Sequence, residues 1–145
     1  MNELAFQARL VKGAKSLGGY AQKMSNRHIA GVPDLFVKLK SYEGVFIECK
    51  IQKNWKGPYS RLDLTKLQRQ TLYRMHSAAQ PCGWVMLYQE KGPRDKYAAA
   101  GADPYAEFAE NNKNCTMIGI DHQYFHVSDI VKQILYWSEK VETTS

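Results

Sequence analysis

Apolar and polar positions in the first half of the chain follow first a helical and then a strand-like pattern. Between Glu3 and Leu17 apolar residues recur every three or four positions, which predicts an amphipathic helix that ends at the glycines of 18–19. A weakly alternating segment at 20–25 is then a candidate first strand, and two apolar segments at 35–39 and 45–51 predict the next two strands. The segment 41–44 carries turn residues, so the second and third strands are expected to form a hairpin.

The second half begins with another helical pattern. Thr65 can cap a helix that runs to about Ala79, with Leu67, Leu72 and Met75 facing inward. The remaining expected elements are a buried strand at 84–88, a mixed segment at 91–114 with a short helix from Asp103-Pro104, strands at 115–120 and 124–127, and a last helix from Ser128 to about Lys140. The resulting order, α-β-β-β-α-β followed by further α/β elements, predicts an α/β domain with a mixed sheet flanked by helices.

Charge is unevenly distributed along the 145 residues. The formal net charge is +6, but residues 1–74 hold 14 Lys or Arg against 5 Asp or Glu, whereas residues 75–145 hold 6 against 9. This asymmetry predicts a basic face built by the first half and an anionic partner, although a Lys-rich composition alone gives the same count. The three cysteines form no Cys-x-x-Cys pair, and no apolar run is long enough to cross a bilayer. We therefore expect a cytoplasmic protein, not secreted and without a membrane partner.

Three charged residues form the candidate site. Side chains alternate along a strand, so Glu48 and Lys50 share one face of the strand at 45–51. A hairpin centred near residues 42–43 places Asp34 across from Lys50 and diagonal to Glu48. Diagonal neighbours lie about 7–8 Å apart at Cα, close enough for two carboxylates to share one divalent cation.

The two carboxylates predict a hard cation. Two bare carboxylates about 7 Å apart repel by roughly 2 kcal/mol at an effective dielectric constant of 20, and Mg²⁺ or Mn²⁺ offsets this repulsion better than Lys50 alone. Such a site fits phosphodiester hydrolysis, in which Lys50 orients the attacking water or stabilises the developing negative charge. Taken separately, Pro-Asp and Glu-x-Lys are also common on solvated strands.

Three segments carry a resemblance to a known family. Residues 31–36 (GVPDLF) and 45–50 (VFIECK) resemble the PD-(D/E)XK nuclease superfamily. Residues 64–68 (LTKLQ) resemble the helix opening of its virus-type replication-repair nuclease (VRR-NUC) and Holliday junction resolvase-like branch. The resemblance covers about residues 3–90 and implies a restriction-endonuclease-like α-β-β-β-α-β core there. We expect a single nuclease domain of residues 1–145, in which an α/β appendage at about 91–141 follows this core.

The resemblance also implies roles for individual residues. Lys50 is the implied catalytic lysine, and Gln68 is an implied supporting polar group at the site. The implied ligands of Mg²⁺ or Mn²⁺ are the carboxylates of Asp34 and Glu48 and the main-chain carbonyl of Cys49, with Glu3 in the position of an assisting carboxylate on the first helix.

Cations interleaved with aromatic residues follow directly after Lys50. Cations bind phosphates and aromatic rings stack on unpaired bases, so the segment 52–63 predicts a clamp on DNA near a junction or a single-stranded region. Alternatively, it is a solvated loop with Trp55 packed against the body of the protein. The residues expected to contact DNA are Lys53, Trp55, Lys56, Tyr59, Arg61, Lys66, Arg69 and Arg27.

These features together predict a Mg²⁺- or Mn²⁺-dependent deoxyribonuclease. With no added recognition module, it is expected to select branched DNA, junctions or flaps by structure. The resemblance implies a role in replication, repair or recombination, in a bacterial or virus-infected cell. Cutting both strands of a junction needs two sites, so a homodimer is expected. The alternatives are a nucleic-acid-binding module without activity, a ribonuclease, and a protein-interaction domain.

Overall fold

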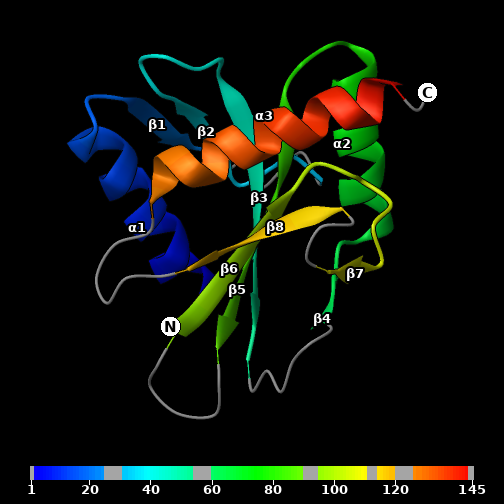
Figure 1. The fold of residues 1–145 in the computed structure, drawn as a ribbon, viewed down its shortest axis with the longest axis horizontal. Helices are drawn as coiled ribbons and strands as arrows, with labels where there is room; N and C mark the ends of the chain where they lie inside the picture. The colour runs from blue at the N-terminus through cyan, green and yellow to red at the C-terminus, as the bar shows by residue number, and fades with distance from the viewer. Residues whose placement is uncertain are drawn as a thin grey trace.

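A six-stranded mixed sheet forms the centre of the computed structural model, which describes residues 2–24, 31–53, 60–89, 95–110, 114–119 and 126–143 (Figure 1). The strands of this sheet are β1 (Tyr20–Lys23), β2 (Leu35–Lys38), β3 (Val45–Gln52), β5 (Cys82–Gln89), β6 (Asp95–Gly101) and β8 (Cys115–Gly119). They lie in the order β1-β2-β3-β5-β6-β8, and every neighbouring pair is antiparallel except β3 and β5. Two short strands, β4 (Ser60–Arg61) and β7 (Phe108–Ala109), form a separate antiparallel pair.

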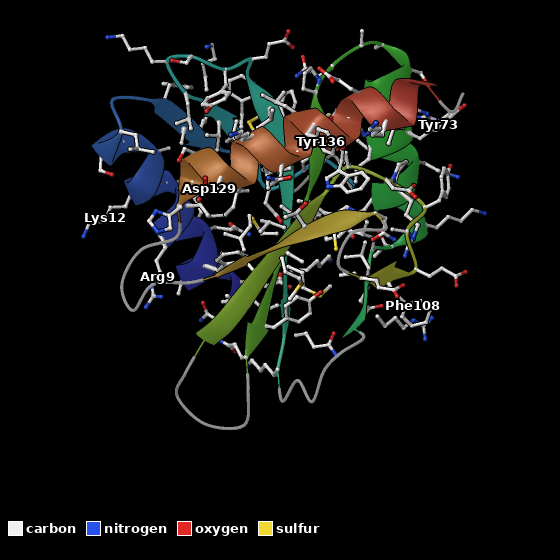
Figure 2. All side chains as sticks on the ribbon, viewed as in Figure 1. Arg9, Lys12, Tyr73, Phe108, Asp129 and Tyr136 are labelled. Atoms are coloured by element: carbon white, nitrogen blue, oxygen red, sulfur yellow. The ribbon has the colours of Figure 1, made fainter. Side chains whose placement is uncertain are left out.

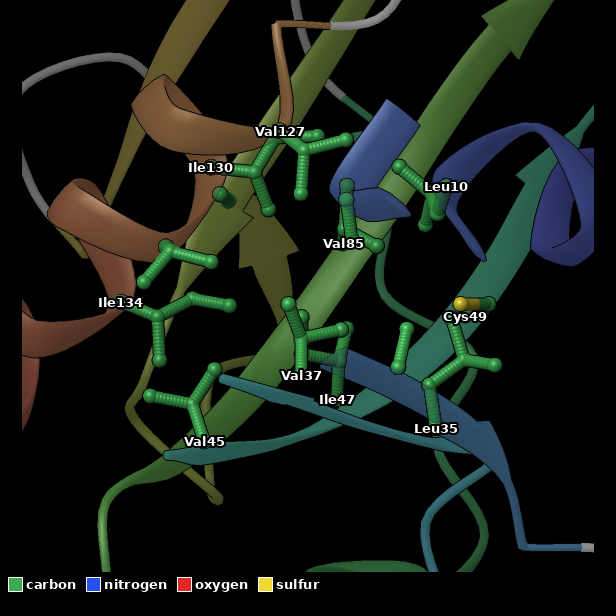
Figure 3. Close-up of a cluster of buried hydrophobic side chains, with 14 of the residues drawn as sticks. Leu10, Leu35, Val37, Val45, Ile47, Cys49, Val85, Val127, Ile130 and Ile134 are labelled. Carbon is green, nitrogen blue, oxygen red and sulfur yellow. The ribbon is translucent and has the colours of Figure 1, made fainter. Parts of the chain in front are cut away.

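Helices cover both faces of the sheet. Helix α1 (Glu3–Ser16) and helix α3 (Val127–Thr143) pack on one face, where apolar side chains of β2, β3 and β5 meet those of the two helices (Figure 3). Helix α2 (Lys66–Ser77) packs on the other face through Leu72, beside Trp84 and Met86 of β5. Strand β5 is buried along its whole length because alternate residues enter the two clusters, which explains its continuous apolar sequence.

The predicted α-β-β-β-α-β order and mixed α/β architecture are confirmed. Both predicted helices of this region begin at a capping residue: Asn2 Oδ1 accepts from the Ala5 amide at 2.8 Å, and Thr65 caps α2. Helix α1 ends before Gly18, which has a φ of +74°, a conformation that glycine adopts without strain. The inward orientation predicted for Leu67 is wrong, because this side chain is 42 % exposed.

The predicted register of the β2–β3 hairpin is wrong by two residues. Leu35 lies opposite Ile47, so Asp34 and Glu48 are the next residues outward from this pair and lie on the opposite face of the hairpin from it. The expected register placed Asp34 opposite Lys50. A shift of two residues keeps the same faces, and it brings the two carboxylates closer together than predicted.

The turn between β2 and β3 explains this difference. The amide of Tyr42 donates to the Leu39 carbonyl at 3.1 Å, and Lys38 Nζ donates to the same carbonyl at 2.8 Å. Gly44 lies flat against the ring of Phe36, where an added Cβ would be 2.4 Å from Cζ. Gly44 therefore accommodates a neighbouring aromatic ring, and the turn is centred earlier than the sequence pattern suggested.

Residues beyond β5 continue the same sheet. Strands β6 and β8 extend it on the β5 side, and α3 packs over β5, β6 and β8. The short helix expected from Asp103 is absent among the described residues; Asp103 Oδ1 instead accepts from the Tyr105 amide at 2.9 Å in a turn. The strand expected at 124–127 also differs, since Val127 starts α3 and residues 124–125 lie outside the described ranges. Within the described helices, none has the length and apolar character needed to cross a membrane.

Candidate active site

Asp34 is fixed in place by the strands on either side of it. It precedes β2, and its main-chain carbonyl accepts from the Met24 amide at 2.8 Å. Its half-buried carboxylate accepts from the Cys49 amide of β3 through Oδ2, also at 2.8 Å. Because a main-chain donor holds one oxygen, the carboxylate has a defined orientation next to Glu48.

Glu48 is the buried acid of the site, with only 3 % of its surface exposed. Its Oε1 accepts from Gln68 Nε2 at 2.8 Å and lies 3.9 Å from Lys50 Nζ. Its Oε2 is also buried and has no hydrogen-bond donor within the described parts of the chain. A buried carboxylate oxygen without a donor is costly, so this atom requires an explanation.

Burial raises the pKa of the Glu48 carboxyl from 4.5 to about 8. The next cause is repulsion by Asp34, and a protonated Glu48 can also donate to Asp34, which raises the pKa further. Lys50 acts in the opposite direction, and Glu3 adds a small increase. Without a bound cation, Glu48 therefore keeps its proton at neutral pH.

Gln68 connects the start of α2 to this acid. The segment Thr65-Lys66-Leu67-Gln68 forms a capping box, in which the Gln68 amide donates to Thr65 Oγ1 at 3.1 Å and the Thr65 amide donates to Gln68 Oε1 at 2.9 Å. Because Oε1 accepts from a main-chain N–H, the NH₂ group must point the other way, toward Glu48. The capping role of Thr65 was predicted, whereas its effect on the orientation of Gln68 was not.

A pocket of about 410 Å³ opens beside Lys50. Its charged lining residues are Glu3, Lys50, Lys53, Arg61 and Asp63. The structure therefore brings Glu3, at the start of α1, to the same pocket as Lys50, near the end of β3. Burial also raises the pKa of the Cys49 thiol, whose side chain packs in the core on the opposite face. This thiol is consequently neutral and takes no part in the pocket.

The donor set fits a hard divalent cation. Asp34 and Glu48 supply neighbouring carboxylates, and the buried Oε2 without a donor is the kind of atom that a cation would satisfy. Within the described ranges, no group of three His, Cys, Asp or Glu side chains converges, so Asp34 and Glu48 would be joined by other oxygen ligands, of which main-chain carbonyls and water are common. The parts assigned to the Cys49 carbonyl and to Glu3 stay predictions.

The residues expected to contact DNA fall into three groups. Lys53 and Arg61 are exposed on the pocket, and Lys66 is exposed in the first turn of α2. Arg69 is bound within the chain, as described next. The remaining four lie outside the described residues: Arg27, Trp55, Lys56 and Tyr59.

The guanidinium group of Arg69 donates to four main-chain carbonyls. These bonds, of 2.6 to 3.2 Å, link the segment before α2 to the segment before β7 through the carbonyls of Leu62, Leu64, Pro104 and Ala106. Arg69 therefore has a structural role, and we leave it out of the DNA surface. The sequence does not distinguish the two roles, because both use an exposed-looking basic residue on a helix.

Two aromatic residues that the sequence pattern does not single out lie next to Arg61. Tyr105 and Phe108 line a second pocket of about 500 Å³ together with Arg61, Arg69 and Glu107. The only local signal for them is their position after the Asp103-Pro104 turn.

No family model matches the chain, and no curated protein does so. Among solved structures, it is similar to Hjc, a Holliday junction resolvase from the archaeal hyperthermophile Archaeoglobus fulgidus. The two chains are 11 % identical, the similarity covers 93 % of this chain and 98 % of that chain, and the TM-score is 0.49. We take no function from this similarity and rely on the residues of the site.

Proposed function

We propose that the protein is a divalent-metal-dependent endonuclease of the PD-(D/E)XK type that hydrolyses phosphodiester bonds in DNA. The observation that supports this proposal is the environment of Glu48: a buried carboxylate beside Asp34, with one oxygen held by Gln68 and close to Lys50 and the other without a donor. Ionised Glu48 is disfavoured by its burial and by the neighbouring charge of Asp34, and a hard cation between the two carboxylates offsets both effects.

Each residue has a distinct task in this proposal. Asp34 and Glu48, with the Cys49 carbonyl, would hold Mg²⁺ or Mn²⁺, which supplies polarisation of the phosphate and a lowered pKa of water. The Lys50 ammonium orients the attacking water or neutralises the charge that develops on the phosphate oxygens. Gln68 holds Glu48 in one position, so the acid is already ordered before substrate binds.

The surroundings of the site favour nucleic acid as the substrate. Lys53 and Arg61 lie on the pocket next to Lys50, and Lys66 is exposed at the start of the following helix. These cations suit a phosphate backbone. We further propose selection of branched DNA, junctions or flaps, a role in replication, repair or recombination, and a homodimer that places two sites on one junction.

A cleavage assay tests the proposal. Supercoiled plasmid, linear duplex, a four-way junction and RNA are incubated with the protein in Mg²⁺, in Mn²⁺ or in EDTA. We expect DNA to be cut only with metal, and Asp34→Asn and Lys50→Ala to lose about 100-fold or more in rate while junction binding persists. Matched controls are Asp129→Asn and Lys12→Ala, which alter exposed residues on α3 and α1 (Figure 2) and should cut like the wild type.

The outcomes separate the alternatives. Unchanged cutting in both site variants would refute the assignment of the site. Junction binding without cutting in any metal would indicate a nucleic-acid-binding module, and preferential cutting of RNA would indicate a ribonuclease.

A further inference from the structure

Exposed aromatic side chains gather on one side of the proposed active site. Phe108 on β7 is 47 % exposed, and Tyr105 in the preceding turn is 56 % exposed. Tyr73 on α2 is also exposed, and its ring lies 5.9 Å from that of Tyr105 in a tilted arrangement (Phe108 and Tyr73 are labelled in Figure 2). Aromatic clusters on a surface commonly mark a binding site.

Arg61 belongs to the same surface. It is the residue directly opposite Phe108 in the β4–β7 pair, so the two side chains project from the same face. Arg61, Tyr105 and Phe108 also line the pocket of about 500 Å³. We call these three residues the aromatic platform.

The platform is held rigidly by the main chain around it. Arg69 joins the carbonyls of residues 62 and 64 to those of 104 and 106, and the Leu62 amide donates to the Glu107 carbonyl at 2.7 Å. Tyr105 is further fixed by the bond from its amide to Asp103 Oδ1. A preorganised surface loses little conformational entropy when a ligand binds.

The platform adjoins the pocket beside Lys50. Arg61 lines both pockets, the one that contains Lys50 and the one that contains Phe108. A nucleic acid strand with a phosphate beside Lys50 can therefore extend past Arg61 onto Tyr105 and Phe108.

We propose that the aromatic platform binds unpaired bases of a DNA strand, so that duplex DNA with a single-stranded arm is the preferred substrate. This inference rests on the proposed function, because the occupant is the strand that enters the nuclease site. Aromatic rings and a guanidinium group are the side chains on which single-stranded bases stack. The carboxylate of Glu107 in the same pocket repels phosphate, which favours bases rather than backbone at this position.

Binding measurements in EDTA test the platform without cleavage. The probes are a fluorescein-labelled 20-nucleotide single strand, a 20-base-pair duplex, and a duplex with one splayed arm that carries 2-aminopurine. We expect Tyr105→Ala and Phe108→Ala each to weaken binding of the single strand and the splayed duplex at least about fivefold. Affinity for the plain duplex should stay within twofold. Quenching of 2-aminopurine by stacking should be lost together with the affinity.

Two sets of variants serve as controls. Tyr136→Ala removes an equally exposed aromatic residue from α3 and should leave all affinities unchanged. Tyr105→Leu and Phe108→Leu keep apolar bulk without a flat ring, and should weaken binding nearly as much as alanine does. Circular dichroism checks that every variant is folded.

Several results would overturn the inference. One is an unchanged affinity for the single strand in both alanine variants, and another is full affinity in the leucine variants. A third is a shift from dimer to monomer in sedimentation of the alanine variants, because it would show that a second copy of the chain covers the surface. Failure of the nuclease proposal looks different: a wild-type protein that never cuts DNA, yet binds single strands through Phe108, would refute the activity and keep the platform.

Discussion

Gln68 donates a hydrogen bond to Glu48 across 2.8 Å, and the opposite end of the same side-chain amide accepts from the amide of Thr65. One group therefore completes the cap of helix α2 and fixes the acid on β3. The start of the helix and the position of Glu48 therefore depend on the same residue. Mutations of Gln68 and Thr65 can separate its capping role from its contact with Glu48.

Replacement of Gln68 and of Thr65 should have different effects on activity. Gln68→Ala removes half of the capping box and the donor to Glu48, so we expect stability to fall by about 1 kcal/mol and cleavage to fall strongly. Thr65→Ala removes only the other half of the box, with a similar loss of stability but a small loss of cleavage. Urea unfolding and cleavage rates measure the two effects. Equal losses of activity would mean that Gln68 acts through the helix alone.

Metal-free stability should depend on pH through Glu48. The folded protein keeps the Glu48 proton up to about pH 8, whereas the unfolded chain releases it near 4.5. The contribution of Glu48 to the free energy of unfolding is therefore greatest below pH 4.5, and it is lost as the pH rises from 4.5 to about 8. Since one pKa unit corresponds to about 1.4 kcal/mol, Glu48→Gln in EDTA should exceed the wild type by on the order of 2–4 kcal/mol at pH 8 and match it near pH 4.5. Parallel pH profiles for the two proteins would contradict this.

Divalent metal should reverse this loss. Metal binding requires the ionised form of Glu48, so affinity for Mg²⁺ or Mn²⁺ should rise with pH up to about 8. Thermal unfolding is measured without Mg²⁺ and at Mg²⁺ concentrations that rise in 10-fold steps. The increase in Tm that Mg²⁺ causes should be larger at pH 8 than at pH 6. Asp34→Asn should abolish the increase, and Asp129→Asn should retain it. An equal increase in all three proteins would indicate binding elsewhere.

The sequence predicted the elements that carry the site, because their signals are local. Alternation along β3 placed Glu48 and Lys50 on one face, and the capping pattern placed Thr65 at the start of α2. The register of the hairpin was not predictable, because the turn residues at 41–44 allow more than one centre for the turn, and the observed pairing has it one residue earlier than expected. The contacts of Arg69 and the position of Phe108 opposite Arg61 depend on segments distant in the chain, which local patterns do not reveal.

Mutation of Arg69 should lower the stability of the protein, whereas mutation of Lys66 should change its DNA binding. Arg69→Lys cannot form the four-carbonyl network, so we expect a loss of about 2–4 kcal/mol of stability. Lys66→Ala should change stability by less than about 0.5 kcal/mol, because the side chain is exposed. Lys66→Ala should also weaken the salt dependence of binding to duplex DNA, so that the slope of log K against log [salt] becomes less negative by about 0.9.

The two variants require urea unfolding and fluorescence anisotropy at four salt concentrations. An Arg69→Lys protein as stable as the wild type would contradict the structural role of the four-carbonyl network. An unchanged slope in Lys66→Ala would remove Lys66 from the DNA surface.

The buried oxygen of Glu48 without a donor also has an evolutionary consequence. In the metal-free state above about pH 4.5, glutamine at position 48 makes the better-folded protein, because folding does not require it to take up a proton, whereas Glu48 must be protonated to be buried. A library of this chain screened for solubility or protease resistance alone would therefore drift toward glutamine. Under the proposed function, only a screen that rewards DNA cleavage would retain the glutamate, and the proposed metal ligand would be lost when that reward is withdrawn.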